Sequence, residues 1–97
     1  MPDPRASRLV ADVGGTNSRL AVFDPPTNEL RALRTYVNRG YGRFEDIIAA
    51  WLDALAGPPP TECCLAVAAP PFGDRVTMPN IGWSFSQREL ATRFGFP

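Results

Sequence analysis

The fold of this chain is decided by an apolar run that ends in a carboxylate and a glycine pair, Leu9-Val10-Ala11-Asp12-Val13-Gly14-Gly15-Thr16-Asn17. Consecutive apolar residues predict a strand over residues 8–13 that is covered on both faces. The glycine pair permits unusual backbone angles and suits a tight turn. A second apolar run predicts a strand over residues 18–23. We therefore expect an antiparallel hairpin whose turn carries Asp12 at its entrance.

Further strands and a helix are expected outward from this hairpin. The segment from Asp24 to Asn28 is a strong turn signal, and an imperfectly alternating strand over residues 30–37 should lie at a sheet edge. Its alternation places Leu30, Ala32 and Arg34 on one face and Leu33, Thr35 and Val37 on the other. A helix is predicted by apolar residues at helical spacing, namely Phe44, Ile47, Ile48, Trp51, Leu52 and Leu55. Gly57 and three prolines end it.

The second half of the chain predicts a parallel strand and a short helix. Residues 62–69 are nearly all apolar, so we expect a central strand that returns parallel to the first. Its Cys63 and Cys64 should point to opposite faces, both as small buried residues. A short strand is expected over residues 76–78. Ser86 and Glu89 have the spacing of a capping box and should open a helix that runs to Phe94.

This order of elements predicts the fold class. Three antiparallel strands, then a helix and a parallel strand, form the start of a ribonuclease-H-like α/β unit of the actin-like ATPase type. Residues 1–7 are polar and contain two prolines, so they are expected to form a flexible tail.

The composition excludes several chemistries. All 10 basic residues are arginine, 10 acidic residues balance them, and histidine is absent. A Walker-type phosphate loop, a Schiff base, a Ser-His-Asp triad and an HExxH zinc site are therefore excluded. Zero net charge gives no attraction to nucleic acid or to a membrane surface. No stretch approaches the roughly 20 apolar residues of a membrane span, and we expect a cytoplasmic protein.

The turn from Asp12 to Asn17 still offers phosphate chemistry. Backbone amides beside Gly14 and Gly15 can approach an anion closely, and Thr16 and Asn17 add polar side chains. Asp12 would repel a phosphate, but it can hold a hydrated Mg²⁺ that bridges to phosphate oxygens. The plainer alternative is a hairpin in which the glycines only make the turn. The six-residue pattern at the end of an apolar strand favours the phosphate site.

The stretch from Leu9 to Ala21 resembles the N-terminal phosphate loop of bacterial glucokinases, members of the sugar kinase, actin and chaperone ATPase superfamily. Two later stretches resemble the same family. The first is Leu65-Ala66-Val67-Ala68-Ala69-Pro70 followed by Gly73-Asp74, and the second is Met78-Pro79-Asn80-Ile81-Gly82-Trp83-Ser84-Phe85-Ser86. The likeness extends from Leu9 to Phe96. It implies that residues 8–97 are the N-terminal part of the small domain of a sugar kinase.

That family transfers the γ-phosphoryl group of ATP to the 6-hydroxyl of glucose. The resemblance implies that Asp12 serves Mg²⁺, that Asn80 lies near the sugar, and that the catalytic base lies beyond Pro97. It also implies a homodimer for the full-length protein. ATP phosphates would be contacted by Ala11, Asp12, Val13, Gly14, Gly15, Thr16 and Asn17.

Several readings stay open from the residues alone. Asn80 could equally hold a turn, and Trp83 and Phe85 suit core packing better than a sugar-pocket wall. Arg19 suits an ion pair with Asp12 better than phosphate contact. The chain could also be a non-catalytic nucleotide-binding or regulatory module, or another superfamily member such as a repressor or a chaperone ATPase.

Overall fold

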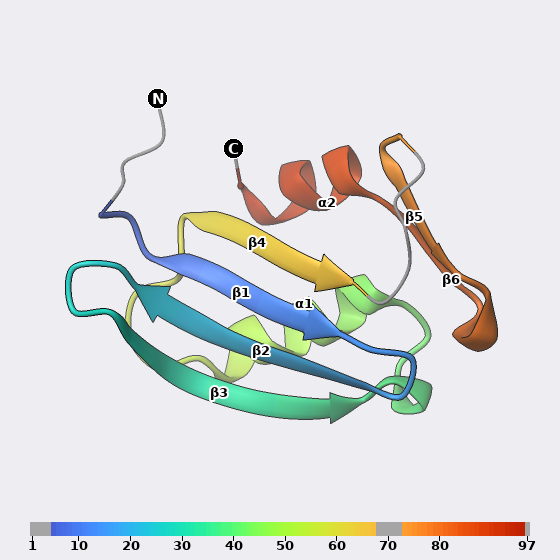
Figure 1. Cartoon of the computed structure of the whole chain (residues 1–97), viewed down its shortest axis with the longest axis horizontal. Coiled ribbons are helices and arrows are strands. Elements are labelled where there is room, and N and C mark those ends of the chain that lie inside the picture. Colours follow the sequence, from blue (N-terminus) through green and yellow to red (C-terminus); the bar gives the residue numbers. More distant parts are fainter. Residues whose placement is uncertain (1–4, 68–72, 97) are drawn as a thin grey trace.

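A computed structural model describes residues 5–67 and 73–96 of the chain. Four strands form one sheet in the order β3-β2-β1-β4, and β5 pairs with β6 in a separate antiparallel hairpin (Figure 1). In chain order the elements are β1 (Arg8–Val13), β2 (Asn17–Asp24), β3 (Glu29–Val37), the 3₁₀ helix η1 (Asn38–Gly40), α1 (Phe44–Ala54), β4 (Glu62–Val67), β5 (Arg75–Met78), the 3₁₀ helix η2 (Pro79–Ile81), β6 (Trp83–Ser86) and α2 (Gln87–Phe94).

The sheet confirms the predicted strand directions. β1 pairs antiparallel with β2, β2 pairs antiparallel with β3, and β4 returns parallel to β1. β3 lies at an edge, as its imperfect alternation predicts. β4 was expected to be central but forms the opposite edge of the sheet among the described residues. Although β4 is apolar, it pairs with only one strand, β1, within the described residues. The last two residues of the predicted strand, 68 and 69, lie outside the described ranges.

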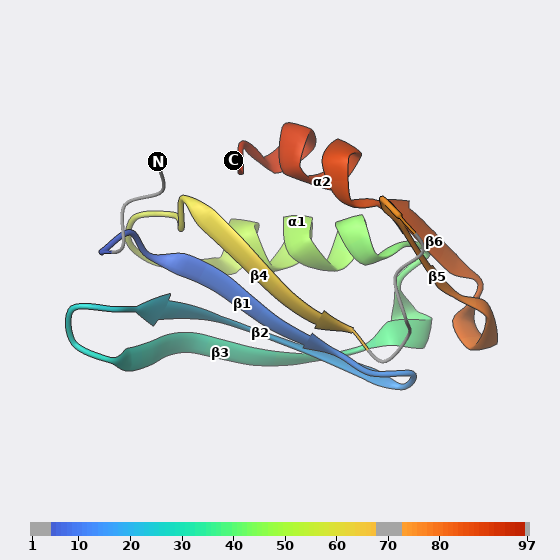
Figure 2. The ribbon, with the colours of Figure 1, turned by 45° about the horizontal axis from the view of Figure 1, so that its top comes forward.

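The core lies between the sheet and two helices that cover the same face (Figure 2). The predicted helical stripe provides one side of it, because Phe44, Ile47, Ile48 and Trp51 are all buried. Alternate residues of β1 and β2 provide the other side, since strand side chains alternate between faces. These sheet residues are Leu9, Ala11, Val13, Leu20 and Val22.

The β5–β6 hairpin extends this core beyond the sheet. Trp83 and Phe85 are buried on β6, and their ring centroids lie 5.9 and 5.2 Å from that of Phe44. Core packing, the role favoured for both rings, is confirmed. The strand β6 itself was not predicted, although alternating Trp83-Ser84-Phe85-Ser86 has the period of two that marks a strand.

A bulge in β3 overturns the predicted faces of that strand. The register with β2 shifts between Leu20 and Val22, and Ala32 has a φ of 57°. One extra residue on the bulged strand reverses the alternation of side chains beyond it. Leu30 and Leu33, predicted on opposite faces, consequently lie together on the outer face, where both line a shallow hollow.

The cysteines confirm one prediction and correct another. Cys63 packs against the core while Cys64 is exposed, so the two point to opposite faces as expected. The expectation that both are buried is wrong for Cys64, because it projects from the outer face, away from both helices. The structure holds both as free thiols.

Hydrogen bonds anchor the start of the second helix and the start of the first strand. The Glu89 amide donates to Ser86 Oγ at 3.2 Å, as the capping pattern predicts. The Arg88 amide donates to Asp74 Oδ1 at 2.8 Å, so the β5 turn supplies a second cap. Of the predicted tail, residues 1–4 lie outside the described ranges, and the Ser7 carbonyl accepts from the Thr61 and Glu62 amides at 3.1 and 3.3 Å.

Candidate phosphate-binding site

The candidate site is the loop of residues 14–16 that joins β1 to β2. Val13 is buried at the end of β1, and the Gly14 amide donates to the Asn17 carbonyl at 2.9 Å, which closes the turn. Figures 1 and 2 both show this loop at the same end of the molecule as η2, the short helix between β5 and β6. The fold therefore presents the loop at the carboxyl ends of the parallel strands, where open α/β sheets bind ligands.

The two glycines of the loop play different parts. Neither Gly14 nor Gly15 has a positive φ, so the turn does not use the unusual backbone angles that glycine permits. A Cβ on Gly14 would lie 3.3 Å from the Asn17 carbonyl oxygen, which is tighter than ordinary contact. A Cβ on Gly15 would meet nothing within 4 Å. The fold thus restricts Gly14, whereas the missing side chain of Gly15 leaves open space in front of the loop.

Possible hydrogen-bond donors lie beside this open space. Gly15 and Thr16 are exposed, and within residues 5–67 and 73–96 the structure records no hydrogen-bond acceptor for either amide. The Thr16 hydroxyl and the Asn17 side chain are exposed beside them. Unpaired amides on a small loop form a concavity that suits an anion such as phosphate.

Asp12 stands one strand position before the buried Val13 and points to the outer face of the sheet. It lies opposite Arg19 in the β1–β2 register. The ion pair expected between them is not formed: in the part of the chain that the structure describes, the recorded pairs are Arg31–Asp24 and Arg43–Asp46. Two solvated side chains on a strand gain little from pairing, so each stays available.

The loop fits a hydrated metal ion better than an ion caged by protein. The described ranges contain no group of three potential metal-ligating side chains. A single exposed carboxylate, Asp12, near loop amides with no acceptor among the described residues suits the way Mg²⁺ binds through one or two carboxylates, waters and substrate phosphates.

Two other residues of the predicted site have side chains that are turned away from solvent. The side chains of Ala11 and Val13 are buried in the core between the sheet and α1. Any contact they make with a ligand must therefore use their main-chain atoms, while their side chains hold β1 in place.

Asn38 is a residue of the site that sequence reasoning missed. It follows β3 directly, and its side chain is 1% exposed. Its Nδ2 donates to the Gly14 carbonyl at 2.7 Å, and its Oδ1 accepts from Ser18 Oγ at 2.7 Å. Its own amide donates to the Thr16 carbonyl at 2.8 Å. A single Asn after a strand is a common turn signal, and only the packing of β3 against the hairpin reveals these contacts.

The predicted sugar contact, Asn80, belongs to η2, between β5 and β6. The structure describes its backbone but not its side chain. The loop and η2 stand at the same end of the molecule (Figure 1).

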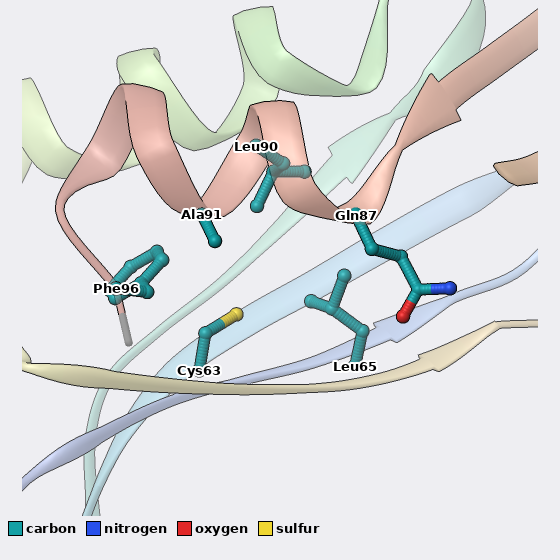
Figure 3. A pocket seen from close by; sticks show the side chains of 6 residues that line it. All are labelled: Cys63, Leu65, Gln87, Leu90, Ala91 and Phe96. Carbon is teal, nitrogen blue, oxygen red and sulfur yellow. The ribbon is translucent and has the colours of Figure 1, made fainter. Parts of the chain in front are cut away.

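A separate cavity of about 230 Å³ lies between β4 and α2. Figure 3 shows Cys63 and Leu65 projecting from β4 toward Leu90 and Ala91 of the helix, with Phe96 closing one end. Burial, aided by the neighbouring Cys64, raises the pKa of the Cys63 thiol to about 12. The thiol therefore stays protonated and is a poor nucleophile or metal ligand at neutral pH.

Together, the mixed sheet, the helices on one face and the phosphate-type hairpin loop define an incomplete α/β domain of the actin-like ATPase class. The family model described as Glucokinase matches residues 9–97. The chain belongs to the glucokinase family.

Relatives and a solved structure agree with this assignment. A glucokinase of Chromohalobacter salexigens is 42% identical over 88 residues, which cover 91% of this chain and 28% of that protein. A glucokinase of Salmonella typhi is 40% identical over 88 residues, which cover 91% of this chain and 27% of that protein. The crystal structure of a glucokinase from an Antarctic psychrotroph aligns with a TM-score of 0.84 at 34% identity, covering 94% of this chain and 30% of that one. The chain thus spans somewhat more than a quarter of the length of these relatives. No helix in the described part of the chain is long and apolar enough to cross a membrane.

Proposed function

We propose that this chain supplies the first phosphate-binding loop of an ATP-dependent glucose kinase, which forms glucose 6-phosphate. The observation that carries the proposal is the loop itself: the exposed Gly15 and Thr16, whose amides have no recorded acceptor in the described part of the chain, lie beside the solvated carboxylate of Asp12. The family assignment and the names of the relatives support glucose and ATP as substrates.

Each part of the loop has a role in this proposal. The Gly15 and Thr16 amides and the Thr16 hydroxyl donate to phosphate oxygens of ATP, and the open space at Gly15 lets the phosphates approach the backbone. Asp12 holds Mg²⁺ through water; the ion, when bound, neutralises charge on the phosphate oxygens. Asn80, at the same end of the fold, lies near the sugar. Catalysis of phosphoryl transfer depends mainly on positioning the substrates and stabilising charge. The loop groups can do both without lysine or histidine.

The proton acceptor for the sugar hydroxyl lies outside residues 1–97 in this proposal. The chain by itself therefore binds nucleotide but does not phosphorylate glucose. In the complete enzyme, residues 8–97 form the first part of the small domain, and the enzyme is a cytoplasmic homodimer that takes no nucleic acid or membrane partner.

Two measurements on the purified chain test this function. Titration with Mg-ATP should show saturable binding, and a coupled assay should show no glucose-dependent ATP consumption. Asp12→Ala should weaken Mg-ATP binding roughly 10- to 100-fold, because a charge-assisted contact contributes about 1.5–3 kcal/mol. Asp53→Ala removes an exposed carboxylate on α1 and serves as the matched control. Binding unaffected by Asp12→Ala would contradict the assignment of the loop.

A non-catalytic nucleotide-binding module is the second candidate. The same loop supports it, because nucleotide binding needs only the donors and Asp12. It predicts the same titration, but no activity when the chain is joined to the remaining part of a glucokinase such as that of Chromohalobacter salexigens. Activity of that hybrid protein favours the kinase.

A further inference from the structure

Asn38 occupies an unusual position for a polar side chain. It is 1% exposed, yet it lies against the one loop that carries the phosphate-site donors. Buried polar groups cost free energy unless they are hydrogen-bonded, and each side-chain heteroatom of Asn38 has a partner on the β1–β2 hairpin. One side chain thus joins Gly14, the first residue of the loop, to Ser18 on the following strand.

The contact with Gly14 determines how the loop faces solvent. The structure has no cis peptide bonds among its described residues, and in a trans peptide the carbonyl and the following N–H point in opposite directions. Because Nδ2 of Asn38 holds the Gly14 carbonyl at 2.7 Å, the Gly15 N–H points away from the buried Asn38. The backbone amide of Asn38 orients the peptide between Thr16 and Asn17 in the same way. It donates to the Thr16 carbonyl at 2.8 Å, so the Asn17 N–H points away from Asn38.

We infer that Asn38 is the positioning residue of the phosphate loop. It does not touch the ligand: through the Gly14 carbonyl it holds the Gly15 amide in the orientation that receives a nucleotide phosphate before the nucleotide arrives, and through the Thr16 carbonyl it fixes the end of the loop. This inference rests on the proposed function for the ligand, whereas the orientation of the loop is a property of the fold.

The chemistry of the position favours an amide side chain. An aspartate of the same shape keeps an acceptor for Ser18 but replaces the donor to Gly14 with an oxygen, so two oxygens would face each other. An alanine removes both side-chain contacts and leaves only the main-chain bond to Thr16. Ser18→Ala removes the opposite contact of Asn38 while the bond to Gly14 remains. It is therefore the matched control: it disturbs the same buried network without releasing the loop.

The experiment compares Asn38→Asp, Asn38→Ala and Ser18→Ala with the unaltered chain. The first measurement is hydrogen exchange at the Gly14 amide, which is bonded to the Asn17 carbonyl and reports opening of the turn. The second is the dissociation constant for Mg-ATP, and circular dichroism verifies that each variant is folded. Both Asn38 variants lose the bond to the Gly14 carbonyl, so they should speed exchange at Gly14 and weaken Mg-ATP about 10-fold; Ser18→Ala keeps that bond and should change both by less than about 3-fold.

The outcomes separate this inference from the proposed function. Unchanged Gly14 exchange in folded Asn38→Asp would overturn the inference, and so would an equal loss of Mg-ATP affinity in Ser18→Ala, because Asn38 would then act only through general stability. If the unaltered chain does not bind Mg-ATP, the proposed function fails. Faster Gly14 exchange in the Asn38 variants would then still support the claim that Asn38 orients the loop.

Discussion

The indole Nε1 of Trp51 donates a hydrogen bond of 3.0 Å to the carbonyl oxygen of Ala32. Ala32 is the residue of β3 with a φ of 57°, so the bond joins the buried face of α1 to the bulge of the edge strand. A carbonyl displaced from its ladder by a bulge needs another donor when it is buried. The helix supplies that donor and thereby holds in place the strand that leads into Asn38.

Replacing Trp51 by Phe should therefore destabilise the chain by about 1–3 kcal/mol, because the Ala32 carbonyl loses its partner and the smaller ring leaves a cavity. Thermal unfolding followed by circular dichroism measures the loss. Trp83→Phe is the control, since Trp83 is equally buried but the described residues provide no recorded hydrogen bond to its indole. Equal losses in the two variants would show that the bond to Ala32 contributes nothing.

The two loop glycines should respond differently to alanine. Gly15→Ala should leave stability within about 0.5 kcal/mol, because the new methyl group meets nothing within 4 Å and the residue has no positive φ. It should nevertheless weaken Mg-ATP binding roughly 10-fold or more by blocking phosphate from the amides. Gly14→Ala should lower the unfolding temperature, because its methyl group crowds the Asn17 carbonyl. Unfolding scans and titrations on both variants test the distinction, and full Mg-ATP affinity in Gly15→Ala would contradict a phosphate at this loop.

Asp74 should make the second helix sensitive to acid. The hydrogen bond from the Ser86 hydroxyl, with that from the Arg88 amide, holds the pKa of the Asp74 carboxyl below its usual value. A lowered pKa in the folded state contributes stability that is complete above the ordinary Asp pKa and is lost as pH falls through the folded value. The unfolding temperature should therefore begin to fall below about pH 4. Asp74→Asn should flatten this dependence, whereas Asp53→Asn should not; identical acid profiles in the two variants would contradict the role of Asp74.

The outer face of the sheet should cause the isolated chain to associate. Leu30 and Leu33 are 59% and 61% exposed on this face, and β4 has no neighbour on its second edge within the described residues. Apolar surface and an open strand edge both favour contact with another copy. Sedimentation velocity should show dimers or larger species, and Leu33→Lys should shift the distribution toward monomer. Ala54→Lys, which adds the same charge to an exposed turn of α1, should not. A monomeric unaltered chain would contradict this expectation.

The sequence predicted most of the fold because its signals are local. The spacing from Phe44 to Trp51 predicts the helix and its buried stripe, and the apolar runs beside Asp12 predict β1 and β2. The bulge at Ala32 was not predictable, because Ala rarely adopts a positive φ and the side chains give no sign of the shift. The strand β6 was missed despite its alternation. The apolar run around Cys64 suggested that this residue is buried, but its exposure depends on which face of the sheet the helices cover, and the local sequence does not show that.

The candidate site divides in the same way. The sequence by itself indicated its chemistry: without lysine or histidine, a phosphate site in this chain would use arginine, a carboxylate, a hydroxyl or backbone amides, and residues 12–17 contain the last three. Only the tertiary structure decided how these groups are oriented. Asn38 lies 24 residues from Gly14 along the chain, and it reaches the Gly14 carbonyl only because β3 pairs beside β2. Local sequence determines which donors a loop contains, but the direction in which its amides point is set by contacts between segments that folding brings together.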